Sequence, residues 1–173
     1  MIQEARFGRG RVYLGTSLEK EVNDLEEWED GKLTQRAKKI LSQARDETLH
    51  RGYTCIDTEF ILLALLKSKG EVRRLLQSMG VEPEVVLRSM DAILPRSVVG
   101  SISVIDPEKI TLSLNSATLI TSAINEAHRN GREEANEADL LIGAICEGET
   151  AASILGHFEI YLMDAREARS KIK

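Results

Sequence analysis

The stretch DTEFILLALL, residues 57–66, decides the fold because it is apolar nearly all round beyond its first turn. A helix without a polar face is typical of the centre of a helical protein. Asp57 or Thr58 is expected to cap it, because such side chains accept hydrogen bonds from the free backbone N–H groups of a helix start. The sequence therefore predicts a buried central helix here, with other helices packed around it.

The same pattern returns 79 positions later as NEADLLIGAI, residues 136–145. The flanking residues follow the same offset, with identities such as Ala44 on Ala123 and Gly52 on Gly131. A shared spacing of apolar, glycine and acidic positions over roughly 60 residues indicates one helical unit used twice. We therefore predict an all-α protein built from two copies of a helical repeat.

The two copies are named repeat 1 (residues 33–94) and repeat 2 (residues 113–173). Each repeat is expected to hold four helices. In repeat 1, Thr34 is the expected N-cap of the first helix, and Pro83 is expected to open the fourth. In repeat 2, we expect helices at about 113–130, after Asn136, at 149–156 and at 161–172.

Two further segments complete the predicted organisation. Residues 1–32 form an N-terminal extension, with a basic arm followed by an acidic amphipathic helix that ends near Gly31. Residues 95–112 form a linker that is rich in β-prone side chains. No second run of that kind exists to pair with it, so we expect an extended linker and no sheet.

Composition excludes several classes of function. The net charge of -5 argues against a nucleic-acid partner. No apolar run reaches 18 residues, so no membrane span is expected, and the N-terminus has no signal-peptide core. Two cysteines, Cys55 and Cys146, do not suggest a disulfide framework, which favours the cytoplasm or an equivalent reducing organelle compartment.

No constellation of catalytic or ligand-binding residues stands out. Residues 10–17, GRVYLGTS, nearly match a phosphate-binding loop, but Thr16 replaces the lysine and no strand precedes it. The three histidines and two cysteines lack the spacing of a metal site. No serine or threonine has a nearby histidine and acid to activate it. We expect no cofactor, no metal and no catalytic residue.

Repeat 1 carries a family resemblance along its length. The segments that carry it are LTQRAKKIL (33–41), ARDE (44–47), RGY (51–53), DTEFILLALL (57–66) and LLQSMGV (75–81). They resemble the Clp N-terminal repeat, whose pattern runs F-T-x-R-A-x-x-V-L, A-x-x-E-A, L-G-H, G-T-E-H-L-L-L-G-L-L and L-x-x-L-G-V. Repeat 2 is in register with this pattern but matches it less closely, and residues 1–32 lie outside it.

The resemblance implies a pseudo-twofold bundle of eight helices, four per repeat. It also implies a role, because domains of this family stand at the N-terminus of Clp AAA+ unfoldases or occur as separate small proteins. They bind adaptor proteins and degradation substrates for the ATPase ring. We therefore expect a non-catalytic protein-recognition domain whose partners are Clp unfoldase or protease subunits, adaptors and substrate polypeptides.

One branch of the family recognises arginine-phosphorylated substrates through the glutamate of the G-T-E-H motif in each repeat. Glu59 occupies that position in repeat 1, where a carboxylate can hold a guanidinium in a bidentate pair. In repeat 2 the matching residue is Ala138, and Glu137 stands one place earlier, about 100° away around a helix. The resemblance therefore implies phosphoarginine recognition at one site at most.

The resemblance places the binding surface in the grooves between the two repeats, near the start of the second helix of each. The candidate partner-binding residues are Thr34, Arg36, Glu59, Ser113, Asn115 and Glu137. Two alternatives stay open. In the first, Glu59 contacts no ligand and is simply an acidic residue in the first turn of its helix, where it interacts favourably with the helix dipole. The whole chain can be an accessory subunit that packs on a Clp ring without reading substrates, which the 1–32 extension favours.

Overall fold

The computed structural model describes residues 31–94, 110–147 and 149–172. Eight α-helices lie in these ranges, so the all-α prediction is confirmed. In repeat 1 they are α2 (Gln35–His50), α3 (Thr58–Lys67), α4 (Glu71–Ser78) and α5 (Pro83–Ile93). In repeat 2 they are α6 (Leu114–Arg129), α7 (Glu137–Cys146), α8 (Thr150–His157) and α9 (Leu162–Lys171). The acidic helix predicted within the extension lies outside the described residues.

Side-chain caps set where several of these helices begin. The Thr34 hydroxyl oxygen accepts a hydrogen bond from the Ala37 N–H group at 3.2 Å, as predicted for α2. Ser113 does the same for α6 by accepting from the Ser116 N–H group at 3.0 Å. Pro83 stands in the first turn of α5, where its missing N–H group costs nothing.

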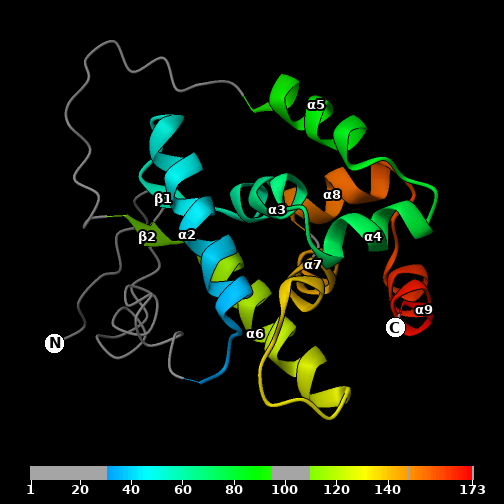
Figure 1. Cartoon of the computed structure of the whole chain (residues 1–173). Helices are drawn as coiled ribbons and strands as arrows, with labels where there is room; N and C mark the ends of the chain where they lie inside the picture. Colours follow the sequence, from blue (N-terminus) through cyan, green and yellow to red (C-terminus); the bar gives the residue numbers. More distant parts are fainter. Residues whose placement is uncertain (1–30, 95–109, 148, 173) are drawn as a thin grey trace, which may run out of the picture.

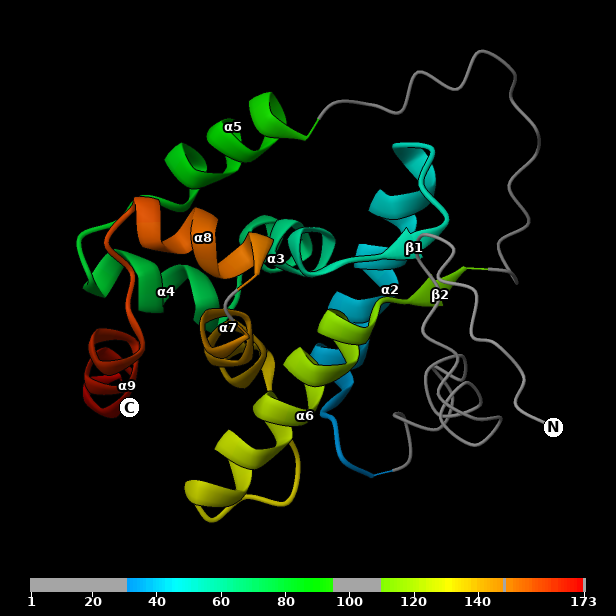
Figure 2. The same cartoon turned by 180° about the vertical axis from the view of Figure 1, so that it is seen from behind.

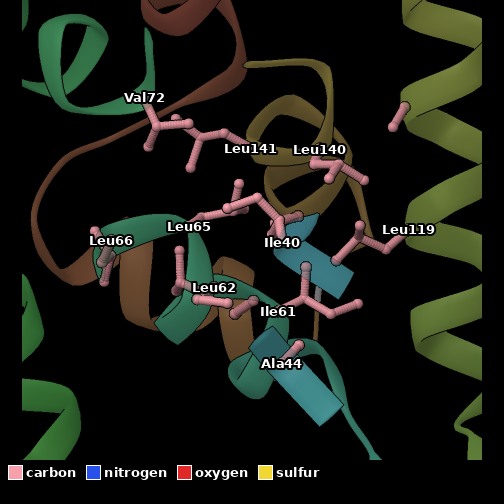
Figure 3. Packing of buried hydrophobic residues seen from close by; sticks show 14 of the residues in the cluster. Ile40, Ala44, Ile61, Leu62, Leu65, Leu66, Val72, Leu119, Leu140 and Leu141 are labelled. Carbon is pink, nitrogen blue, oxygen red and sulfur yellow. The ribbon is translucent and has the colours of Figure 1, made fainter. Parts of the chain in front are cut away.

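The two central helices, α3 and α7, lie in the middle of the molecule with α5 and α9 at its periphery (Figure 1). Every residue of α3 from Phe60 to Leu66 is buried, and α7 is buried from Glu137 to Ala144. Ile61, Leu62 and Leu65 of α3 lie beside Leu140 and Leu141 of α7 in one continuous apolar cluster (Figure 3). The predicted central helices are therefore the shared core of both repeats.

The third helix of each repeat contacts the central helix of the other. The repeat 1 helix α4 packs on α7, and the repeat 2 helix α8 packs on α3. Seen from behind, α8 lies over α3, and α4 lies next to α7 (Figure 2). The two repeats therefore interlock, and each needs the other to cover its central helix.

A short parallel ladder joins the repeats, which corrects the prediction that the linker forms no sheet. Its strands are β1 (Cys55–Ile56) and β2 (Thr111–Leu112), the latter at the end of the predicted linker. A single parallel bridge pairs Leu33 with Ala135. The 79-residue offset relates Ile56 to Ala135 and Leu112 to Leu33, so the bridge is the pseudo-symmetric counterpart of the ladder. The pairing is between distant two-residue segments, which leave no periodicity in the sequence.

None of the helices in the described ranges is long and apolar enough to cross a membrane.

Candidate functional site

The six predicted site residues fall into two pseudo-equivalent places, each made by one helix start from each repeat. Junction one is the meeting of the N-terminal ends of α3 and α6, with Asp57, Glu59, Ser113 and Asn115. Junction two is the meeting of the N-terminal ends of α2 and α7, with Thr34, Arg36, Asn136 and Glu137. The structure therefore brings the predicted residues together in two groups of three.

Junction one is held by hydrogen bonds between the two helix caps. Asp57 caps α3, and its Oδ1 accepts from the Thr58 N–H group at 2.8 Å. The same oxygen accepts from the Ser113 hydroxyl at 2.8 Å, while Ser113 caps α6. The Ser113 N–H group also donates to the Ile56 carbonyl at 3.0 Å. The backbone around junction one is therefore fixed before any partner binds.

Glu59 lies half-buried in the first turn of α3, at junction one. Its Oε2 atom is buried and finds no hydrogen-bond partner in the part of the chain that the structure describes. Burial raises the pKa of this carboxyl group, and the neighbouring charge of Asp57 raises it further. A buried acceptor without a donor is unfavourable, and this distinguishes Glu59 from the other buried polar side chains that the structure describes.

Junction two uses its glutamate differently. Glu137 is 4% exposed, and its carboxylate accepts from the Glu71 N–H group at the start of α4. Gly70 leaves the space for this contact, since a Cβ atom there would lie 1.8 Å from Glu137 Oε1. The Arg36 guanidinium is 4.0 Å from the same oxygen. Glu137 therefore already has an intramolecular partner.

The matching position in repeat 1 shows the same arrangement with a smaller side chain. Thr58 corresponds to Glu137 by the offset, and its hydroxyl oxygen accepts from the Ala151 N–H group in α8 at 3.4 Å. In both repeats, the side chain at this position of the central helix therefore accepts a hydrogen bond from a backbone N–H group at the start of the other repeat's third helix. Sequence reasoning missed this role, because Glu137 and Glu71 are 66 residues apart.

A buried carboxylate with two arginines lies beside junction two, and it is not among the residues predicted from the sequence. Asp139 is fully buried and accepts from Arg132 at 2.7 and 2.8 Å and from Arg169 at 2.5 Å. It also accepts from the Asn136 N–H group at 2.8 Å, which completes a capping box. Burial opposes ionisation, but the hydrogen bonds from Arg132 and Arg169 outweigh it and lower the pKa of Asp139.

The spacing of Asn136 and Asp139 is a readable signal for this capping box. The arginines are not readable from the sequence, because Arg169 reaches Asp139 across 30 residues. Among the described residues, no group of three or more histidine, cysteine, aspartate or glutamate side chains has the arrangement of a metal site.

Comparison with known proteins agrees with this architecture. The family described as "Clp repeat (R) N-terminal domain" matches residues 32–158. The chain is 30% identical over 139 residues to "Negative regulator of genetic competence ClpC/MecB" of Bacillus subtilis (strain 168). That alignment covers 79% of this chain and 16% of the relative. The chain thus spans a small part of the length of that curated relative.

Two solved structures show the same fold at low sequence identity. The N-terminal domain of the chaperone ClpD from Arabidopsis thaliana has a TM-score of 0.61 at 12% identity, covering 82% of this chain and 94% of the other. A structure described as "Preliminary structural investigations of a malarial protein secretion system" has a TM-score of 0.68 at 18% identity, covering 82% and 98%. The resemblance carried by repeat 1 is confirmed, and the chain belongs to the Clp repeat N-terminal domain family.

Proposed function

We propose that this domain recognises partner polypeptides of a Clp unfoldase system, namely adaptors or substrates, at junction one. In this proposal Glu59 receives a basic side chain of the partner. The observation that carries it is the buried Oε2 atom of Glu59, which has no hydrogen-bond partner among the residues described. A donor supplied by a partner would satisfy that oxygen and would also favour the charged form of the carboxylate.

The charge at junction one favours an unmodified basic side chain over phosphoarginine. Asp57 and Glu59 both present carboxylates there, and the pKa of Glu59 is raised by burial first and by the Asp57 charge in addition. A phosphoryl group would be repelled by the same charges, whereas a guanidinium can donate two parallel hydrogen bonds to one carboxylate. Arginine is therefore the preferred side chain of the partner, and its phosphorylated form is the alternative to test.

The proposal assigns this recognition to one junction only. At junction two, the residue that corresponds to Glu59 is Ala138. The neighbouring Glu137 is committed to the Glu71 N–H group. This asymmetry supports a single glutamate-based site in a pseudo-symmetric domain, while Thr34, Arg36, Ser113 and Asn115 remain proposed partner-binding residues at the rims of the two junctions.

The second candidate function is an accessory subunit that packs on a Clp ring without reading substrates. The observation that favours it is the position of the family match, which begins at residue 32 and leaves a charged extension before it.

Affinity capture with variants tests the proposal. The full chain, Glu59→Gln and the control Glu133→Gln are immobilised and exposed to a lysate of cells that express the chain, and bound proteins are identified by mass spectrometry. Glu133 is an exposed residue of the segment before α7. We expect the wild type and Glu133→Gln to retain an adaptor or client proteins, and Glu59→Gln to lose them.

Two results would overturn the proposal. Equal recovery of Clp ring subunits by all three proteins, without clients, would favour the accessory subunit. Equal recovery of the same clients by all three would remove Glu59 from the binding site. Arginine and phosphoarginine peptides derived from a recovered client, measured by calorimetry, then decide which side chain Glu59 accepts.

A further inference from the structure

A groove of about 480 Å³ opens beside junction two and is lined by an excess of positive charge. The first two turns of α2 form one wall with Arg36 and Lys39, and the segment from the end of α3 to α4 forms the other with Lys67 and Lys69. The carboxylate of Glu137 is the acidic member of the lining. The groove therefore presents four cations against one buried carboxylate.

Two of these four cations have no ion-pair partner among the described residues, and a third has only a distant one. Lys67 lies 2.5 Å from Glu47, and the Arg36 guanidinium is 4.0 Å from the carboxylate of Glu137 while its side chain is 75% exposed. Lys39 and Lys69 are exposed and form no ion pair within the ranges that the structure describes. A ligand with several closely spaced carboxylates would complement this groove.

The chain itself carries such a ligand immediately before α2. Residues 19–30 hold seven carboxylates and a single lysine. The acidic residues are Glu19, Glu21, Asp24, Glu26, Glu27, Glu29 and Asp30. Asp30 precedes the first residue of α2 by five positions, and Arg36 and Lys39 stand in the first two turns of that helix.

Covalent attachment favours this segment over an acidic partner that arrives from solution. Twelve residues reach at most about 40 Å when fully extended, and the segment is attached next to the groove, because Arg36 and Lys39 follow it in the first two turns of α2. A short tether gives an effective concentration of about millimolar, so weak ion pairs suffice for occupancy. We propose that the basic groove binds the chain's own acidic segment, residues 19–30, as an intramolecular contact. This inference does not rest on Glu59 or on the proposed function of junction one.

The chain contains a built-in probe for this contact. Trp28 is its sole tryptophan and lies inside the acidic segment, so tryptophan fluorescence reports on that segment alone. The experiment measures acrylamide quenching and fluorescence anisotropy of the full chain at about 0.01 M and about 1 M salt, where the Debye length is about 30 Å and 3 Å. The test variant is Lys39→Glu with Lys69→Glu, and the control is Arg88→Glu with Arg129→Glu, which makes the same charge change on exposed residues outside the groove.

At low salt we expect the wild type and the control to show a protected tryptophan with high anisotropy. In the groove variant, the quenching constant is expected to rise about twofold or more, as it does for the wild type in high salt, because both changes weaken the ion pairs. Circular dichroism checks that the groove variant keeps its helices, which the exposure of Lys39 and Lys69 favours.

Three results would overturn the inference. Identical quenching in the three proteins would mean that the segment does not contact the groove. An equal rise in the control and the groove variant would reduce the effect to net charge. Anisotropy that falls on dilution of the wild type would assign the contact to the acidic segment of a second copy.

Discussion

At the scale of single residues, the pKa values of two carboxyl groups near the junctions move in opposite directions. Asp139 is fully buried, and its arginine partners lower its pKa despite the cost of burial. Glu59 is half-buried, has a buried oxygen without a described partner, and burial raises its pKa. Ionisation of the first group therefore stabilises the fold, whereas ionisation of the second opposes it.

Substitution of Asp139 by asparagine is expected to lower the free energy of unfolding by about 3 kcal/mol at neutral pH, because Arg169 would keep its mostly buried position without its counter-charge. Since the folded-state pKa is lowered, the contribution is present above the usual pKa of about 3.9 and is lost as the pH falls through the folded value. Urea denaturation followed by circular dichroism measures both effects.

The control is Glu167→Gln, which removes an exposed carboxylate paired with Lys171 and is expected to leave the unfolding midpoint unchanged. An equally stable Asp139→Asn protein would contradict the role given to the buried network.

Substitution of Glu59 by glutamine is expected to maintain or raise the free energy of unfolding at neutral pH. The folded-state pKa is raised, so the wild type loses stability as the pH rises from the usual value of about 4.3 through the folded value, and glutamine removes that loss. The measurement is urea denaturation of both proteins between pH 4 and pH 8. A destabilisation of about 0.3–1 kcal/mol would instead identify Glu59 as a residue that serves the helix dipole.

At the scale of helices, the crossing of α6 and α7 depends on one missing side chain. A Cβ atom at Gly143 would lie 2.4 Å from the backbone oxygen of Leu119, which a side-chain rotation cannot relieve. We expect Gly143→Ala to lower the free energy of unfolding by about 1–3 kcal/mol.

The matched control is Gly156→Ala in α8, where nothing lies within 4 Å of the added atom. That substitution is expected to stabilise the protein by about 0.5–1 kcal/mol, since alanine favours a helix over glycine. Thermal unfolding of both variants measures their stability relative to the wild type. A Gly143→Ala protein as stable as the wild type would show that α6 and α7 can move apart without a cost in free energy.

The same scale shows how far the sequence predicts this structure. The starts of α2, α3 and α6 follow from local chemistry, because Thr34, Asp57 and Ser113 accept hydrogen bonds from residues within three positions. The buried helices follow from their composition. The parallel pairing of β1 with β2 and the contact of Glu137 with Glu71 join residues more than 50 positions apart, and no local pattern encodes them. The sequence therefore predicts that these residues lie between the repeats, but it predicts neither their division between two junctions nor the hydrogen bond that Glu137 accepts from Glu71.

At the scale of the whole molecule, interlocking makes the two repeats one cooperative unit. Leu76 of α4 and Leu155 of α8 match each other by the 79-residue offset, and both are fully buried. We expect Leu76→Ala and Leu155→Ala each to lower the free energy of unfolding by about 2–5 kcal/mol and to shift a single transition of the entire helical signal. Circular dichroism at several urea concentrations measures this. Two separate transitions, with only one displaced by each substitution, would mean that the repeats fold independently.

Each third helix packs on the central helix of the other repeat, and this packing can hold the two repeats together without the peptide bonds that join them. The contacts of α4 with α7 and of α8 with α3 do not involve residues 95–109. A proteolytic cut within that segment would therefore yield two chains that remain associated, and the nicked molecule would behave as a heterodimer. Its stability would then depend on its concentration, because dissociation of the fragments would expose both central helices to water.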